Sequence, residues 1–278
     1  MLSSIRLTNT GKIPLSLYCI GGLSIVMNFI ECPINCSWCP WESNITSKSA
    51  RLIPLNPQSI IGWANEYRAD LIFLHGAEPY TYVDRSIVER IESGTAAAIG
   101  VKANPLIAKD SHSFYTIIDY VDVVVFEVVS SREIDAQVSS LLYMLDRLEI
   151  RSKHIEILAV AETHRDLSGV IVGLISSVKN HSIPINTVLA DGRYGSAHDA
   201  LMAGLRREYP LIQAPTADVI EIASTLCPVC RSMVVIRRDG VAYKVNIDDR
   251  GRCRVCGYKL ADTRTKKFVK LPVDIPLV

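Results

Sequence analysis

The sequence lacks the features that mark membrane, fibrous and disordered proteins. It has no low-complexity tract and no internal repeat of fixed period. The apolar stretch from Cys19 to Ile30 is interrupted by Asn28 and is too short to span a bilayer. Arg6 and Lys12 lie near the N-terminus, but no apolar core with a small-residue cleavage site follows them. We therefore expect a cytoplasmic protein with no signal peptide and no membrane partner.

The composition allows one large domain and a small appended module. Of the 278 residues, 49% are hydrophobic, which is enough to bury a sizeable core. The formal net charge of +1 hides an uneven distribution. Cys227–Lys270 contains 12 Lys and Arg against 4 Asp and Glu, a net charge of +8, and the remainder carries −7. The C-terminal segment is therefore a distinct basic module.

Strand-like and helix-like segments alternate as far as Tyr209. The apolar runs typical of strands buried on both faces are Leu23–Phe29, Asp70–Leu74, Ala97–Ala103, Val121–Val129, His154–Ala161 and Ile185–Ala190. The amphipathic segments between and after them are Pro57–Arg68, Tyr82–Ser93, Leu106–Tyr120, Arg132–Leu148, Leu167–Lys179 and Ala197–Arg207. Two further strand-like runs, Met233–Arg237 and Val241–Asn246, follow in the basic segment.

Repeated strand–helix units predict parallel strands joined by right-handed crossovers, in either a doubly wound sheet or a partial barrel. Residues capable of chemistry follow nearly every run, and the loops at the carboxyl ends of barrel strands form one common site. We therefore predict an α/β fold, with a partial (β/α)6 TIM-type barrel over residues 1–215. A linker that contains Pro215 would lead to a small zinc-ribbon-like β module over residues 226–262.

Three cysteines in the segment Glu31–Pro40 have the spacing C-x3-C-x2-C. Cys32, Cys36 and Cys39 can ligate three irons of a 4Fe–4S cluster and leave the fourth iron open. A catalytic cluster needs an open iron, since a substrate or cosubstrate then ligates it. The alternative is a zinc site in which His75 completes the three cysteines.

With Trp38 directly before the third cysteine, this motif resembles the signature of the radical S-adenosylmethionine (SAM) superfamily. The resemblance implies that the amino and carboxylate groups of SAM chelate the open iron, with Trp38 by the adenine. It also implies that reduction of the cluster cleaves SAM to a 5′-deoxyadenosyl radical, which abstracts a hydrogen atom. A reductant such as ferredoxin or flavodoxin is the implied partner.

A second motif, His75-Gly76-Ala77-Glu78-Pro79, ends the second strand-like run. It resembles the GGEP motif of the same superfamily, although Ala77 replaces the second glycine. The resemblance implies that Gly76, Ala77 and Glu78 hold the SAM amino group; an ordinary turn is the alternative. Weaker candidates for contacts with SAM or substrate stand at or near the ends of other strands: Asn104, Glu127, Ser130, Glu162 and Asp191.

Within the superfamily, the chain most resembles the pyruvate formate-lyase activating enzyme group, and within that group the AmmeMemoRadiSam-type proteins. The likeness spans about Ser24 to Tyr209, and some of those proteins end in a similar cysteine ribbon. Similarity outside the motifs is modest, so the substrate does not carry over.

Two CxxC pairs in the basic module predict a second metal site. The first pair is Cys227 and Cys230, the second pair is Cys253 and Cys256, and 22 residues lie between the two pairs. Gly257 follows the second pair. Four thiolates close a tetrahedral site, which is typical of a structural Zn²⁺. A rubredoxin-like iron and an auxiliary Fe–S cluster are the alternatives. The basic residues around the site are Arg231, Arg237, Arg238, Lys244, Arg250, Arg252, Arg254, Lys259, Lys266 and Lys267.

Three functions follow from these patterns. The first is a radical SAM enzyme that acts on a protein or small molecule, for example as an activase. The second is a radical SAM enzyme that modifies tRNA and grips the nucleic acid with its basic module. The third is a non-catalytic interaction protein in which both cysteine sets are structural.

Overall fold

The computed structural model describes residues 2–30, 53–178, 181–190, 195–215, 217–260 and 274–278. In this part of the chain, nine strands form one sheet in the order β12-β1-β2-β3-β4-β5-β6-β7-β8. The strands are β1 Leu2–Asn9, β2 Leu23–Phe29, β3 Leu71–Gly76, β4 Ala98–Ala103, β5 Val123–Val129, β6 His154–Ala161, β7 Ile185–Leu189, β8 Ile212–Gln213 and β12 Ile275–Pro276. No helix among the described residues is long and apolar enough to cross a membrane.

The strands from β2 to β8 are parallel and follow one another in sequence order. The mostly parallel sheet of an α/β protein is thus confirmed, and all six strand-like runs form strands within two residues of their predicted ends. β1 was not predicted. It pairs antiparallel with β2, and β12 pairs antiparallel with β1.

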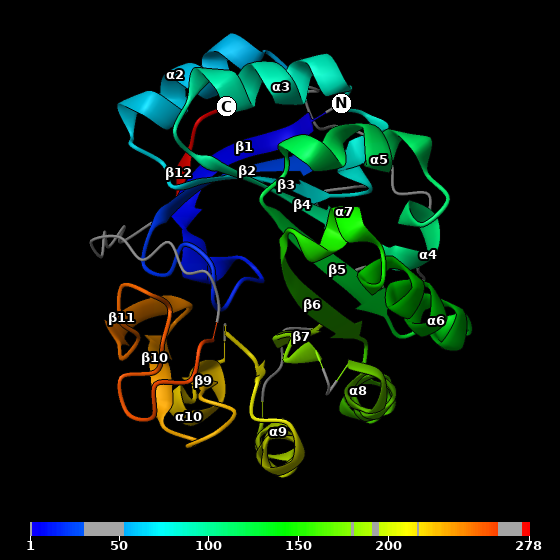
Figure 1. The fold of residues 1–278 in the computed structure, drawn as a ribbon, viewed down its shortest axis with the longest axis vertical. Helices are drawn as coiled ribbons and strands as arrows, with labels where there is room; N and C mark the ends of the chain where they lie inside the picture. Colours follow the sequence, from blue (N-terminus) through cyan, green and yellow to red (C-terminus); the bar gives the residue numbers. More distant parts are fainter. Residues whose placement is uncertain (1, 31–52, 179–180, 191–194, 216, 261–273) are drawn as a thin grey trace.

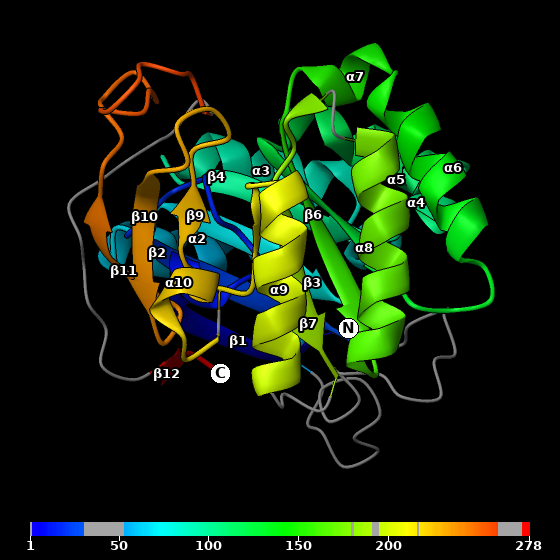
Figure 2. The ribbon, with the colours of Figure 1, turned by 90° about the horizontal axis from the view of Figure 1, so that it is seen from below.

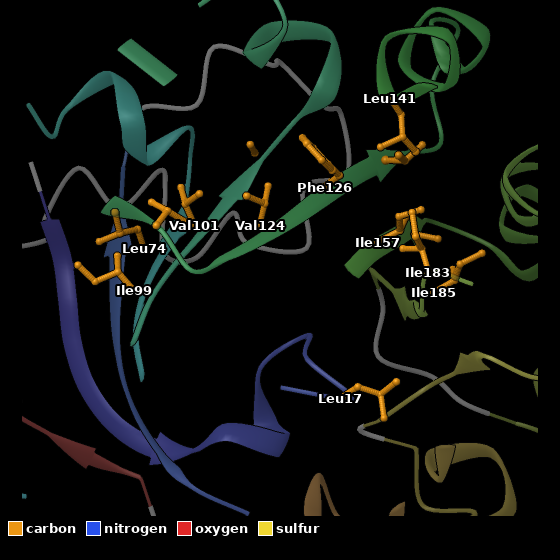
Figure 3. Packing of buried hydrophobic residues seen from close by; sticks show 14 of the residues in the cluster. Leu17, Leu74, Ile99, Val101, Val124, Phe126, Leu141, Ile157, Ile183 and Ile185 are labelled. Atoms are coloured by element: carbon orange, nitrogen blue, oxygen red, sulfur yellow. The ribbon is translucent and has the colours of Figure 1, made fainter. Parts of the chain in front are cut away.

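The helices cover one face of the curved sheet (Figure 1). The α-helices of this layer are α2 Pro57–Glu66, α3 Arg85–Gly94, α4 Pro105–Ala108, α5 His112–Ile117, α6 Ile134–Leu145, α7 Leu148–Arg151, α8 His164–Val178 and α9 Ser196–Glu208. Short 3-10 helices are η1 Thr10–Lys12, η2 Pro79–Thr81 and η3 Ile118–Tyr120. Strand residues such as Val124 and Phe126 pack with helix residues such as Leu141 in the larger core cluster (Figure 3).

The single helix predicted over Leu106–Tyr120 is wrong, because three short elements occupy that segment. α4 ends at Ala108, and a new helix begins after Ser111, whose hydroxyl accepts the Phe114 N–H at 3.3 Å. A serine that caps a new helix start interrupts the earlier helix. At the other end of α4, Asn104 follows β4 and caps the helix, since its side chain accepts the Leu106 N–H at 3.0 Å.

The opposite face of the sheet has its own apolar core. Side chains that alternate along the strands, such as Val26, Phe73 and Val125, form this second cluster. Ile13, Leu15, Tyr18 and Cys19 from the segment between β1 and β2 pack into it; this segment, residues 13–20, is called the plug. The plug therefore fills the concave side of the sheet near the amino-terminal ends of the strands.

The C-terminal module contains a three-stranded sheet of order β11-β10-β9. Its elements are α10 Ile220–Ala223, β9 Thr225–Leu226, β10 Met233–Arg238 and β11 Val241–Val245. The predicted linker before Leu226 is therefore wrong: Ile222, Ala223 and Thr225 are buried, and Thr225 pairs with Val235. Figure 2 shows this module beside α9.

Candidate functional site

A row of polar side chains lines the concave face of the sheet toward the carboxyl ends of its strands. Residues two apart in a strand point to the same face. Each polar residue of this row stands two positions after another residue of its strand: Asn28 after Val26, His75 after Phe73, Lys102 after Gly100, and Glu127 after Val125. Val26, Phe73 and Val125 belong to the concave core, and a Cβ on Gly100 would meet the Phe73 ring. The concave face thus changes from apolar to polar as the strands approach their carboxyl ends.

Lys102 lies at the centre of this row, with 1% of its side chain exposed. Its Nζ is 2.5 Å from Glu127 Oε2 and 3.8 Å from Glu78 Oε1. Burial raises the pKa of Glu78, although the nearby Lys102 charge and hydrogen bonds from Tyr80 and the Asn104 amide act in the opposite direction. The three charged groups form a buried network with two carboxylates and one ammonium, called the charged triad below.

Asn104 connects the charged triad to the helical layer. Its backbone N–H donates to Glu78 Oε2 at 3.0 Å, and its side chain donates to the Glu127 carbonyl at 3.2 Å and to Gln137 Oε1 at 3.0 Å. Gln137, on α6, in turn donates to the Val129 carbonyl at 2.9 Å. The predicted residues Glu78, Asn104 and Glu127 are therefore brought together.

His75 is a neutral neighbour of the triad. Its Nδ1 is 3.1 Å from Asn28 Oδ1, and the Asn28 Nδ2 donates to Ser4 Oγ at 2.8 Å. The amide oxygen of Asn28 therefore accepts the Nδ1–H of His75. Burial, together with the charges of Lys102 and Arg6, lowers the pKa of His75 to about 3, so its ring carries no charge at neutral pH.

The segment Gly76–Glu78 lies against the end of β2. Phe29 pairs with Gly76, and the Ala77 N–H donates to the Phe29 carbonyl at 3.1 Å. Gly76 has φ +95°, and a Cβ there would collide with the Phe29 backbone. Only glycine fits this close strand approach, which explains why this position of the motif is glycine.

Five of the other residues predicted for this site cannot be placed relative to the triad. Cys32, Cys36, Cys39, Trp38 and Asp191 lie outside the described residues. Glu162 follows β6 and is exposed, and none of the contacts in the described residues joins it to the triad. Its contact with SAM stays a prediction.

Sequence reasoning missed Lys102 and Gln137. The signal for Lys102 was present, since it is the one charged residue in the run Ala97–Ala103. A lysine in a strand buried on both faces needs a carboxylate partner. Gln137 carries no such signal, because a polar residue on an amphipathic helix is usually solvated.

The four cysteines of the module form a second candidate site. The Sγ atoms of Cys227, Cys230, Cys253 and Cys256 all lie within 4.8 Å of one another. Cys227 and Cys256 are 3.5 Å apart, and Cys230 and Cys253 are 3.7 Å apart. Zn–S bonds of about 2.3 Å imply S···S separations of about 3.8 Å in a tetrahedron, so the donor set fits one tetrahedral ion.

Both cysteine pairs adopt the same turn. The N–H groups of Arg231 and Gly257 donate to the carbonyls of Cys227 and Cys253 at 3.0 and 2.8 Å, and both residues have positive φ. Although burial opposes ionisation of Cys253, hydrogen bonds from Ser232 and from the Cys256 and Val255 N–H groups hold its pKa below the ordinary value. The group can hold a metal ion such as zinc.

The module docks on the amino-terminal side of the parallel strands, away from the charged triad. Arg237 is buried and donates to Thr225 Oγ1 at 2.7 Å and to the Ser16 carbonyl of the plug. Glu156, near the start of β6, accepts the Ser16 and Leu17 N–H groups at 2.8 Å. The cysteine site therefore lies toward the amino-terminal ends of the parallel strands, and the triad lies toward their carboxyl ends.

No protein-family model matches the chain, and a comparison with curated proteins finds no similar protein.

Proposed function

We propose that the chain is a radical SAM enzyme with a partial (β/α)6 barrel, in which Cys32, Cys36 and Cys39 hold a 4Fe–4S cluster. Its reaction is the one-electron reductive cleavage of SAM to methionine and a 5′-deoxyadenosyl radical. That radical then takes a hydrogen atom from a protein or small-molecule substrate. The sequential order of the parallel strands from β2 to β8 is consistent with a barrel-like arrangement.

The observation that carries the proposal is the junction between β2 and β3. The Phe29 carbonyl accepts the Ala77 N–H, so the end of the strand that leads toward Cys32 touches the Gly76–Glu78 motif. In sequence the two motifs are 36 residues apart, from Cys39 to His75. The end of β2, which precedes the cysteine motif in sequence, thus meets the Gly76–Glu78 motif at neighbouring strand ends, as a shared binding site for SAM requires.

The charge of the site also supports this ligand. Glu78, Glu127 and Lys102 together carry one excess negative charge when both carboxylates are ionised, and His75 is neutral. SAM carries a sulfonium, an ammonium and a carboxylate, and thus one net positive charge. An uncompensated buried charge costs several kcal/mol, so a ligand of opposite charge is favoured.

The cluster supplies the electron for SAM cleavage when it is bound. Gly76, Ala77 and Glu78 are proposed to hold the SAM amino group; Trp38, Asn104, Glu127 and Glu162 are proposed for other contacts. A reductant such as ferredoxin or flavodoxin is the expected electron donor. The four cysteines of the module are proposed to hold a structural Zn²⁺.

Anaerobic reconstitution tests the proposal. The protein should take up one 4Fe–4S cluster whose spectrum changes with SAM, and dithionite should then release 5′-deoxyadenosine. Cys36→Ala should abolish this release. Cys19→Ala is the matched control, since Cys19 is a buried cysteine of the plug and should leave the release unchanged. Full release by Cys36→Ala would exclude the assignment.

The tRNA-modifying alternative depends on the basic module. Its exposed cations include Arg231, Arg252 and Lys259, but the module docks at the edge of the sheet opposite the triad. An RNA held there would have to span the sheet to present a base at the triad. A salt-dependent gel shift with tRNA would favour this alternative, whereas a protein without SAM-responsive iron would favour the non-catalytic one.

A further inference from the structure

Lys102 places its ammonium group between the two carboxylates of the charged triad. Its Nζ contacts Glu127 directly and faces Glu78 at 3.8 Å, and all three side chains are buried. Glu78 and Glu127 come from different segments, the loop after β3 and the strand β5. Lys102, on the strand between them, therefore holds together two carboxylates that would otherwise repel each other.

Burial disfavours the ionised form of Glu78 and raises its pKa. Its Oε2 accepts the Asn104 N–H, which suits a carboxylate, but one backbone hydrogen bond does not offset complete burial. A protonated Glu78 would attract a ligand ammonium group far less than a carboxylate does. The state of Glu78 thus depends on the positive charge beside it.

We propose that Lys102 is a positioning residue that keeps the Glu78 carboxylate ionised and oriented to receive the ammonium group of an aminoacyl ligand. The ligand part of this inference rests on the proposed function, since SAM is such a ligand. The ionisation part concerns only residues of the described chain and stands independently of it.

Other titratable groups near Glu78 are accounted for. Tyr80, two residues further on, hydrogen-bonds to it, and the Glu127 charge raises its pKa. His75 lies in β3, three residues before Glu78, and its ring carries no charge at neutral pH. Lys102 is therefore the cation that favours the ionised form of Glu78.

The Asn104 amide offers a direct test, because its N–H donates to the Glu78 carboxylate. We would follow its ¹H–¹⁵N NMR signal against pH in the full chain without SAM. In Lys102→Met, the titration midpoint reported by Asn104 should rise by about one to three pH units. Lys102→Arg should restore the wild-type midpoint. Lys109→Met, a change at a partly exposed lysine on the helical face, should leave it unchanged.

A second variant guards against misfolding of Lys102→Met. Glu127→Gln removes the carboxylate that competes with Glu78 for the Lys102 ammonium group. Lys102 then pairs with Glu78 alone, so the titration midpoint reported by Asn104 should fall. If the midpoint stayed at the wild-type value in both Lys102→Met and Glu127→Gln, the inference would be overturned.

Calorimetry with SAM then separates this inference from the proposed function. In the wild type, SAM affinity should fall on acidification through the Asn104 midpoint, and in Lys102→Met the same loss should begin at higher pH. If the midpoint rises by one pH unit, the affinity at any pH well below it should fall about tenfold. A wild-type protein that shows the Asn104 midpoint changes but binds no SAM would refute the proposed function alone. SAM binding with an unaltered pH profile in Lys102→Met would refute the positioning role alone.

Discussion

At the scale of single residues, His75 couples the stability of the fold to pH. Its pKa is lowered to about 3 in the folded chain, against 6.5 for an unperturbed histidine. Because the unfolded chain takes up the proton first, the stability that His75 contributes is fully present above about pH 6.5. It is lost progressively as the pH falls toward 3.

This linkage gives a measurable prediction. Between about pH 6 and 4, the wild-type free energy of unfolding should fall by up to about 1.4 kcal/mol per pH unit on account of His75. His75→Asn should remove this contribution to the slope in guanidinium titrations. His181→Asn, at an exposed position, should keep the slope, and an equal slope in His75→Asn would contradict a buried neutral imidazole.

The residues of the site were predictable to different degrees. Glu78, Asn104 and Glu127 stand at strand ends in the sequence, and parallel strands bring such ends to one edge. Lys102 and Gln137 complete the network from positions that periodicity assigns to a buried strand and to a helix surface. The partner of a buried polar group depends on tertiary packing, which local pattern does not encode.

At the scale of elements, β10 joins the module to the rest of the chain through Arg237. The side chain donates to Thr225 of β9 and to the plug, and burial lowers its pKa to about 10, so it remains charged. A charged donor between two segments stabilises both. The plug and the module should therefore loosen together when Arg237 is changed.

Arg237→Met should lower the free energy of unfolding by about 1.5–3 kcal/mol, because hydrogen bonds from a charged group to buried acceptors are lost. Hydrogen exchange should accelerate at the Ser16 and Leu17 amides, which depend on the docked plug. Arg238→Met changes the exposed neighbour on the same strand and serves as control. Unchanged exchange in the plug would mean that Arg237 does not hold it.

Elements with a continuous apolar pattern were predictable, and short paired segments were not. The runs Leu23–Phe29 and His154–Ala161 coincide with β2 and β6. β8 and β9 contain two residues each, so no periodicity can reveal them. The stretch that forms α10 and β9 contains polar residues and follows Pro215, and it is buried by packing with β10 and α9, which lie elsewhere in the sequence.

At the scale of the whole molecule, the two candidate sites should act independently. β6 spans eight residues, so about 25 Å of strand separates its two ends. The module contacts the amino-terminal edge, and the triad lies toward the carboxyl edge. Zinc in the module would therefore contribute to stability and not to chemistry at the triad.

The double variant Cys253→Ser/Cys256→Ser tests this separation. We expect it to lose its zinc and to unfold at lower temperature, since four-thiolate sites stabilise small modules that have little core. Its 4Fe–4S iron content and dithionite-dependent release of 5′-deoxyadenosine should remain. A fall in iron content would indicate that the module holds iron and serves electron transfer.

The plug covers the apolar part of the concave face of the sheet. Ile13, Leu15 and Tyr18 pack against the strands on this side, and Glu156 fixes the plug backbone. Within the described residues, the plug therefore occupies the apolar part of the concave face, between the C-terminal module and the charged triad. A ligand of the charged triad would approach it from the carboxyl ends of the strands and not from the side on which the module docks.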